Sequence, residues 1–157
     1  MASDLGPYRS TQFNRLDAVA LVGVAAKGFA FDVFSPRVCA AKLILDVPNL
    51  DPLQKAKAVD RISKSGTIED CFALFSRNLS SNLQNLVARS LVKKITDEFD
   101  SGMTDAKNSE TSAGFFAMQN AERFLADQKS KVRTLLSSEL VTSADAQKIL
   151  SDFVSSK

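Results

Sequence analysis

Basic side chains at helical spacing are the residues of this sequence whose pattern could do chemistry. Three stand at i, i+4 and i+7 and two further pairs stand at i, i+4: Lys57, Arg61 and Lys64, then Arg89 with Lys93, then Lys129 with Arg133. Side chains so spaced share a helix face and could contact the phosphates of nucleic acid. Acids on the same helices fit an ordinary solvated face as well. Tyrosine and tryptophan are the usual partners for base stacking, and the sequence has one tyrosine and no tryptophan. We therefore expect any such contact to be with the sugar-phosphate backbone of the nucleic acid rather than with its bases.

Residues suited to catalysis are scarce by comparison. The sequence has no histidine, which removes the commonest general base, the Ser-His and Cys-His nucleophilic pairs and the commonest transition-metal ligand. There is no glycine-rich phosphate loop. Adjacent acids such as Glu69 and Asp70 point to different faces of a helix, where they suit capping and solvation. We therefore expect no enzymatic activity, no cofactor and no metal site.

The two cysteines, Cys39 and Cys71, lie among apolar neighbours and form no C-x-x-C motif. Two isolated cysteines without histidine make a poor structural zinc site. We expect two buried, reduced thiols that pack as small hydrophobes, with a disulfide between them as the alternative. Cys71 falls in the first turns of a predicted helix, where the dipole could lower a thiol pKa, but no partner base accompanies it.

Phenylalanine dominates the aromatic content, with eleven residues against one tyrosine. Phe115 and Phe116 fall away from the apolar side of their predicted helix, and we assign them to a protein interface. The alternative is that this helix starts after Gly114 and that both rings pack into the core. A second group could fill the core or line a pocket for an apolar ligand: Phe29, Phe31, Phe34, Phe72 and Phe75.

Helix start signals recur as N-cap residues followed by proline, or by glutamine or an acid three positions on: Ser35-Pro36, Asp51-Pro52, Ser81-x-x-Gln84 and Val141-Thr142-x-x-Asp145. Gly66 and Gly102 stand where helices should stop. With the apolar spacing between them, these signals predict helices over residues 11–30, 36–46, 52–65, 67–79, 81–100, 112–138 and 143–155.

Apolar spacing indicates how these helices pack. In the 112–138 helix five apolar residues share one side: Met118, Ala121, Leu125, Val132 and Leu136. The 81–100 helix is apolar around most of its girth, which is typical of a central helix. Residues 101–112 are polar and form the one expected flexible loop. We predict an all-α fold, a compact single-domain bundle of about six to seven helices over residues 11–157, after a tail over residues 1–10.

Composition and charge narrow the classes of function. A net charge of +2 argues against a strong general attraction to nucleic acid or to anionic membrane. Residues 1–10 lack the apolar core of a signal peptide, and the longest apolar run, over 18–26, is too short to cross a bilayer. We expect a cytoplasmic protein with no membrane partner. The leading hypothesis is a non-enzymatic protein-interaction or self-assembly subunit that binds itself or another protein. The alternatives are a nucleic-acid-associated protein of nucleocapsid-like or RNA-sequestering type and, more weakly, a carrier for an apolar ligand.

Overall fold

The described part of the chain is built from helices. The computed structural model describes residues 35–109 and 112–156, so the predicted tail, the helix over 11–30, and Phe29, Phe31 and Phe34 lie outside it. Its helices are α2 (Pro36–Leu45), α3 (Pro52–Ser65), α4 (Ile68–Leu74), the 3-10 helix η2 (Phe75–Arg77), α5 (Ser81–Lys107), α6 (Ser112–Ser137) and α7 (Ala144–Ser155). These residues include no strand, which confirms the all-α prediction. None of their helices has the length and apolar character that a membrane crossing requires.

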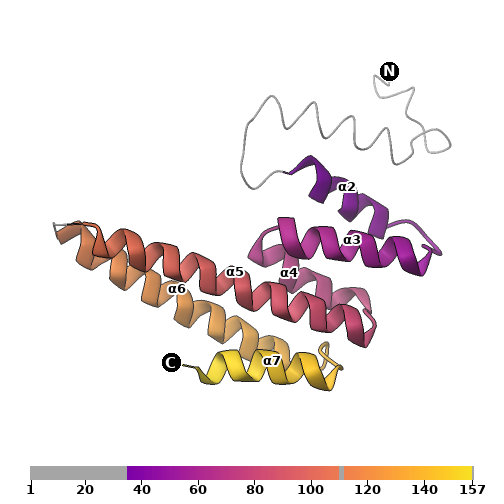
Figure 1. The fold of residues 1–157 in the computed structure, drawn as a ribbon. Coiled ribbons are helices and arrows are strands. Elements are labelled where there is room, and N and C mark those ends of the chain that lie inside the picture. Colours follow the sequence, from indigo (N-terminus) through magenta and orange to yellow (C-terminus); the bar gives the residue numbers. More distant parts are fainter. Residues whose placement is uncertain (1–34, 110–111, 157) are drawn as a thin grey trace. The chain divides into compact units, whose positions relative to one another are not determined.

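Two compact units divide the chain between Thr67 and Ile68. Helices α2 and α3 belong to the first unit, and α4 to α7 belong to the second (Figure 1). The single domain expected over residues 11–157 stays a prediction.

Helices α2 and α3 pack against each other as a hairpin. Both start at the predicted caps. The Ser35 Oγ accepts a hydrogen bond from the Val38 amide at 3.4 Å. The Asp51 Oδ2 accepts one from the Gln54 amide, also at 3.4 Å. The connection turns at Asn49, whose positive φ of 55° is a conformation that asparagine tolerates.

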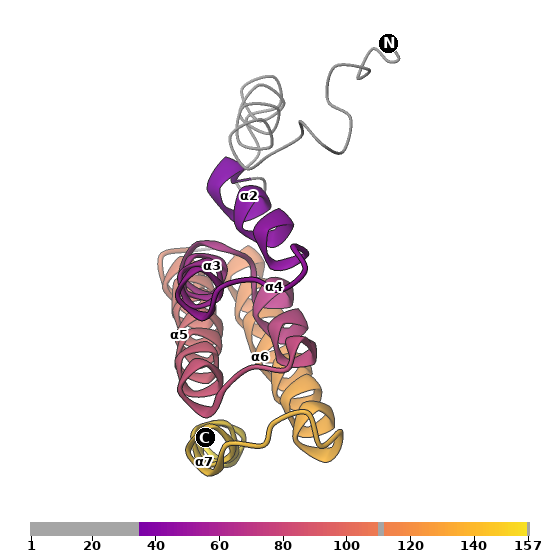
Figure 2. The same cartoon turned by 90° about the vertical axis from the view of Figure 1, so that its right-hand side faces the viewer.

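Helix α5 is central in the second unit, as its apolar girth predicts. Helices α4, α6 and α7 each pack against it, and α6 and α7 also pack against each other. Figures 1 and 2 show α5 and α6 side by side, with α7 beside the end at which α5 begins. The largest fully buried apolar side chains of this unit come from four of its elements: Phe75, Val87, Leu91, Ile95, Val132 and Leu150.

Helix α5 is longer than predicted. Residues 101–107, expected in a flexible loop, continue the helix to Lys107, so the prediction that Gly102 ends it is wrong. Gly102 lies against α6 instead, where a Cβ would come within 3.2 Å of the Ala121 Cβ. Here glycine permits the close approach of two helices rather than the termination of one.

Ser81 and Gln84 do not form the predicted capping box. The N-cap of α5 is Ser80, whose Oγ accepts from the Leu83 amide at 3.4 Å. Gln84 is buried, with 3% of its surface exposed, and its side chain bonds mainly to another part of the chain. The local pattern predicts the start of α5 to within one residue, but a tertiary contact takes the glutamine.

That tertiary contact joins α5 to the connection between α6 and α7. The Gln84 Oε1 accepts from the Thr142 and Ser143 amides, both at 2.9 Å. The Gln84 Nε2 donates to the Thr142 Oγ1 at 3.0 Å and to the Leu79 carbonyl at 3.2 Å. Since Thr142 is committed to Gln84, the N-cap of α7 is Ser143, whose Oγ accepts from the Ala146 amide at 3.3 Å.

The buried side of α6 is rotated from the predicted one. Besides Val132, its buried residues recur at intervals of seven: Gly114, Ala121, Gln128 and Leu135. Three residues predicted on the core side are half-buried: Met118, Leu125 and Leu136. A seven-residue repeat is the spacing of two helices that wrap around each other. Pairing with α5 therefore decides which side of α6 is buried.

Candidate functional site

Phe115 and Phe116 form an exposed aromatic pair near the start of α6. The two residues are 55% and 60% exposed, and their rings meet edge to face with centroids 6.0 Å apart. Since α6 begins at Ser112, the alternative of a later start with both rings in the core is wrong. An exposed apolar patch of this kind is typical of surfaces that bind other proteins.

The aromatic pair belongs to the outer half of the α5–α6 hairpin. We call this half the hairpin arm and define it as residues 96–107 and 112–127. Of these residues Gly114 and Ala121 alone are buried, and all other buried residues of α5 and α6 lie in the inner half. Larger apolar side chains of the arm are half-buried: Phe99, Met103, Met118, Phe124 and Leu125. Because two paired helices bury only the seam between them, the arm presents apolar surface on its outer sides.

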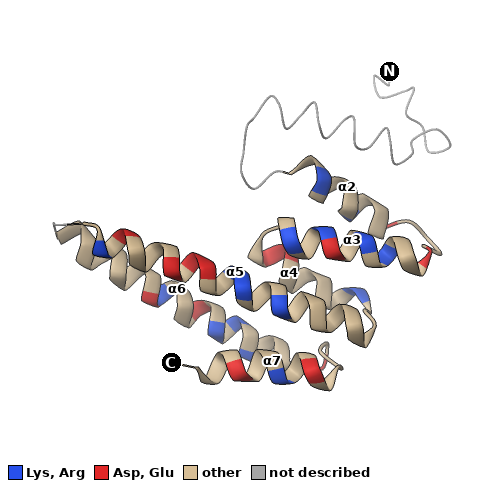
Figure 3. Cartoon of the chain, in the orientation of Figure 1, with Lys and Arg blue, Asp and Glu red and all other residues tan. Residues whose placement is uncertain are grey.

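The hairpin arm is also acidic. It carries six acids, Asp97, Glu98, Asp100, Asp105, Glu122 and Asp127, against two basic residues, Lys107 and Arg123, for a net charge of −4. Figure 3 shows acidic positions gathered on the outer turns of α5. A Cβ on Gly114 would lie 2.8 Å from the Ala106 carbonyl, so Asp105 stands at about the level of the aromatic pair. The arm therefore combines exposed rings with negative charge.

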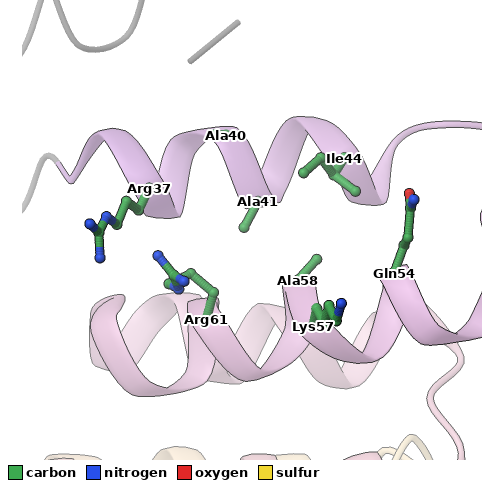
Figure 4. A pocket seen from close by; sticks show the side chains of 8 residues that line it. All are labelled: Arg37, Ala40, Ala41, Ile44, Gln54, Lys57, Ala58 and Arg61. Carbon is green, nitrogen blue, oxygen red and sulfur yellow. The ribbon is translucent and has the colours of Figure 1, made fainter. Parts of the chain in front are cut away.

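A pocket opens between α2 and α3 in the first unit, with a volume of about 270 Å³. Small and aliphatic side chains supply its apolar lining: Ala40, Ala41, Ile44 and Ala58. Figure 4 shows Ala41 and Ala58 pointing from the two helices into the space between them. Alanines leave this space open where larger side chains would close it.

Three cations and one amide complete the lining, and we call the whole the basic pocket: Arg37, Lys57, Arg61 and Gln54. Figure 4 shows Arg37 and Arg61 reaching toward each other at one end. No carboxylate is among the described residues that line the pocket, and none of these pairs with Arg37, Lys57 or Arg61. Like charges that face each other without a counter-charge favour an anionic group between them.

Sequence spacing singles out Lys57 and Arg61 but misses Arg37. Arg37 precedes Asn49 by 12 positions and Arg61 follows it by 12. A hairpin folded at Asn49 thus brings the two arginines opposite each other. The short connection between the two predicted helices was the signal that could have found this pairing, because short connections join antiparallel neighbours.

Two of the other predicted phosphate contacts already have acidic partners on their own helix. Lys64 pairs with Asp60 at 2.9 Å in α3, and Lys93 pairs with Asp97 at 2.7 Å in α5. Both pairs are well exposed, so they add little stability and leave each lysine accessible.

The remaining basic residues belong to the second unit. Arg89 in α5 and Arg133 in α6 are exposed. Lys129 is half-buried: its Nζ donates to the Ser156 carbonyl and lies 5.7 Å from the centroid of the Phe153 ring. The Lys129 ammonium group therefore stabilises the end of α7 through a hydrogen bond and a cation–π contact. The structure brings Lys57 and Arg61 to one pocket, and a role of all seven residues in nucleic-acid binding stays a prediction.

Both cysteines are free, and they differ in environment. Cys71 is buried in α4, and burial raises its pKa from an ordinary 9.0 to about 11, with the charge of Lys94 acting in the opposite direction. Cys39 is half-buried, so the prediction of two buried thiols is right for Cys71 alone. The described residues hold no group of three side chains of the kinds that could bind a metal ion together.

The second phenylalanine group divides between core and surface. Phe75 is buried, as core filling requires, and Phe72 is half-buried. Phe72 lines a shallow, open pocket between α4 and α6 together with Glu69 and Lys131. Four of its five lining residues are polar or charged, and a role in binding an apolar ligand stays a prediction.

Two surfaces of opposite character thus stand out, an acidic and aromatic arm in the second unit and a basic pocket with an apolar lining in the first. No family model, no curated protein and no solved structure matches this chain.

Proposed function

We propose that this protein is a non-enzymatic helical subunit that works by packing against protein, first of all against copies of itself, through the hairpin arm. The observation that carries this proposal is the exposure of Phe115 and Phe116 side by side. Each buried Å² of apolar surface contributes roughly 25 cal/mol, so covering two adjacent phenyl rings provides a strong local driving force for association. Aromatic residues are enriched at the centres of protein interfaces for this reason.

The fold itself gives no reason for aromatic residues at these positions. Phenylalanine forms helices less readily than alanine, so the pair does not favour the first turn of α6. At more than half exposure the rings also add little to the core. A role at the surface accounts for both facts.

The cysteines bear on where the protein acts, and the basic pocket bears on a second possible function. Free Cys39 and Cys71 suit a reducing compartment, so we propose that the protein acts in the cytoplasm. A nucleic-acid-associated role is the second candidate, and the observation that favours it is the set of three cations at the basic pocket that pair with no acid of residues 35–109 and 112–156. An association that survives nuclease treatment speaks for the first candidate.

The test replaces the aromatic pair and leaves the fold intact. We expect Phe115→Ser combined with Phe116→Ser to weaken self-association by about tenfold or more, measured by size-exclusion chromatography with light scattering. Helical content and the thermal midpoint should change little, since both rings are exposed. Leu140→Ser is the matched control, because Leu140 is 43% exposed, follows the far end of α6 in the connection to α7, and lies outside the arm.

Two results would contradict the proposal. Loss of helical signal in the double variant would place the rings in the core, and equal effects of the arm variant and of Leu140→Ser would show that the arm has no special role.

A further inference from the structure

We infer that the basic pocket between α2 and α3 receives the hairpin arm of a second copy of this chain, with a phenyl ring in the apolar lining and arm carboxylates beside the arginines. This inference rests on the proposed self-association and names the surface that the arm binds.

The size and lining of the pocket suit a phenyl ring. Its volume is about 270 Å³, whereas an apolar cavity of roughly 150 Å³ is enough to take up benzene. Ala40, Ala41 and Ala58 present methyl groups against which a ring can pack. Phe115 and Phe116 supply rings that are already more than half in solvent, so no rearrangement of the arm core is needed to offer them.

The charges of the two surfaces are complementary. The arm has a net charge of −4, and residues 35–67, which contain the pocket, carry six basic residues against three acids for +3. An approaching arm carboxylate would place negative charge between Arg37 and Arg61, which face each other without an acidic partner among the described residues. Arginine binds carboxylates in a bidentate geometry and also stacks on aromatic faces, so one side chain can contact both parts of the arm.

The apolar lining favours a protein segment over a nucleic-acid backbone. Four of the eight lining residues are alanine or isoleucine and offer no hydrogen-bond donor to a phosphate. A phosphate pushed against them would lose hydration without replacement. A ring flanked by carboxylates matches both the apolar lining and the three cations.

Such an interface joins two different surfaces, an arm and a pocket. Two copies can exchange arms in a closed dimer, or each copy can leave one arm and one pocket free so that assembly continues into a ring or a filament. This property allows a complementation test on the full-length chain. An arm variant, Phe115→Ser with Phe116→Ser, keeps its pocket, and a pocket variant, Arg37→Glu with Arg61→Glu, keeps its arm.

The experiment measures the mass of each variant alone and of their equimolar mixture by light scattering after nuclease treatment. We expect each variant alone to associate about tenfold or more weakly than the wild type, and the mixture to form a heterodimer that grows no further. Circular dichroism confirms that both variants are folded. Arg37→Gln with Arg61→Gln serves as a milder pocket variant, since glutamine preserves helix propensity.

Each other outcome overturns the inference in a distinguishable way. A pocket variant that assembles like the wild type would show that arms bind elsewhere, while the proposed function stands. A mixture that stays monomeric although both variants lost association would show that the two surfaces do not meet. A wild type that is monomeric after nuclease treatment would remove both proposals and favour phosphate contacts by the pocket cations.

Discussion

At the scale of single residues, Cys71 shows how burial sets chemistry. Its thiol is fully buried, and its pKa is raised to about 11 because the thiolate would lose hydration. Below pH 9 the thiol is neutral in both the folded and the unfolded chain, so its contribution to stability is complete there. Between pH 9 and 11 the unfolded chain loses the proton first, and stability falls as the pH rises.

Replacing Cys71 by alanine should therefore make the alkaline loss of stability shallower. The thiol accounts for up to about 3 kcal/mol of that loss, from a shift of about two units. Urea unfolding at several pH values between 8 and 11 measures the difference, and Cys39→Ala is the control that keeps the Cys71 thiol. A wild type and a Cys71→Ala variant with parallel pH profiles would show that the thiol titrates normally.

Gln84 marks what local sequence rules could not predict. The glutamine four positions after the true N-cap Ser80 matches a capping box counted from Ser81, so the pattern is satisfied by the wrong partner. Three of its four side-chain hydrogen bonds go to Thr142 and Ser143, almost sixty positions away. The backbone amides just before α7 have no partner within a helix, and an unpaired buried amide is costly. The Gln84 side chain therefore accepts hydrogen bonds from them.

At the scale of helices, most starts follow from local chemistry. Ser35-Pro36 and Asp51-Pro52 predict the starts of α2 and α3, and Gly66 follows the end of α3 as expected. The continuation of α5 to Lys107 could not be predicted from the sequence. In an isolated helix glycine is destabilising, whereas in this structure Gly102 allows α5 and α6 to pack closely. For the same reason the buried side of α6 follows the seam with α5 rather than hydrophobicity alone.

The close approach of α5 and α6 gives a paired prediction. In Gly114→Ala the new Cβ would lie 2.8 Å from the Ala106 carbonyl, so backbone must move, and we expect a net loss of roughly 1–3 kcal/mol despite the better helix propensity of alanine. In Gly102→Ala the contact is 3.2 Å to the Ala121 methyl group, and propensity offsets much of the strain. Urea unfolding midpoints should therefore separate the two variants, and equal midpoints would mean that the seam is loose.

At the scale of the whole molecule, one part of the candidate interface could be predicted from the sequence and the other could not. Phe115 and Phe116 stand out in the sequence because they leave the apolar side of their helix, and the structure places both in solvent. The basic pocket does not stand out, because Arg37 and Arg61 meet only when α2 and α3 fold back on each other. Likewise, the nearly balanced total charge of +2 conceals the acidic character of the arm and the basic character of the α2–α3 unit.

The mass of the wild-type chain as a function of its concentration tests the claim of self-association most directly. Light scattering or sedimentation equilibrium at low salt, on nuclease-treated protein, should give a weight-average mass that rises above 17.0 kDa with concentration, to twice that value for a closed dimer and beyond it for a ring or a filament. Added salt should lower the mass, since it screens the attraction between the acidic arm and the basic pocket. A mass that stays at 17.0 kDa up to a concentration of about 1 mM would contradict the account.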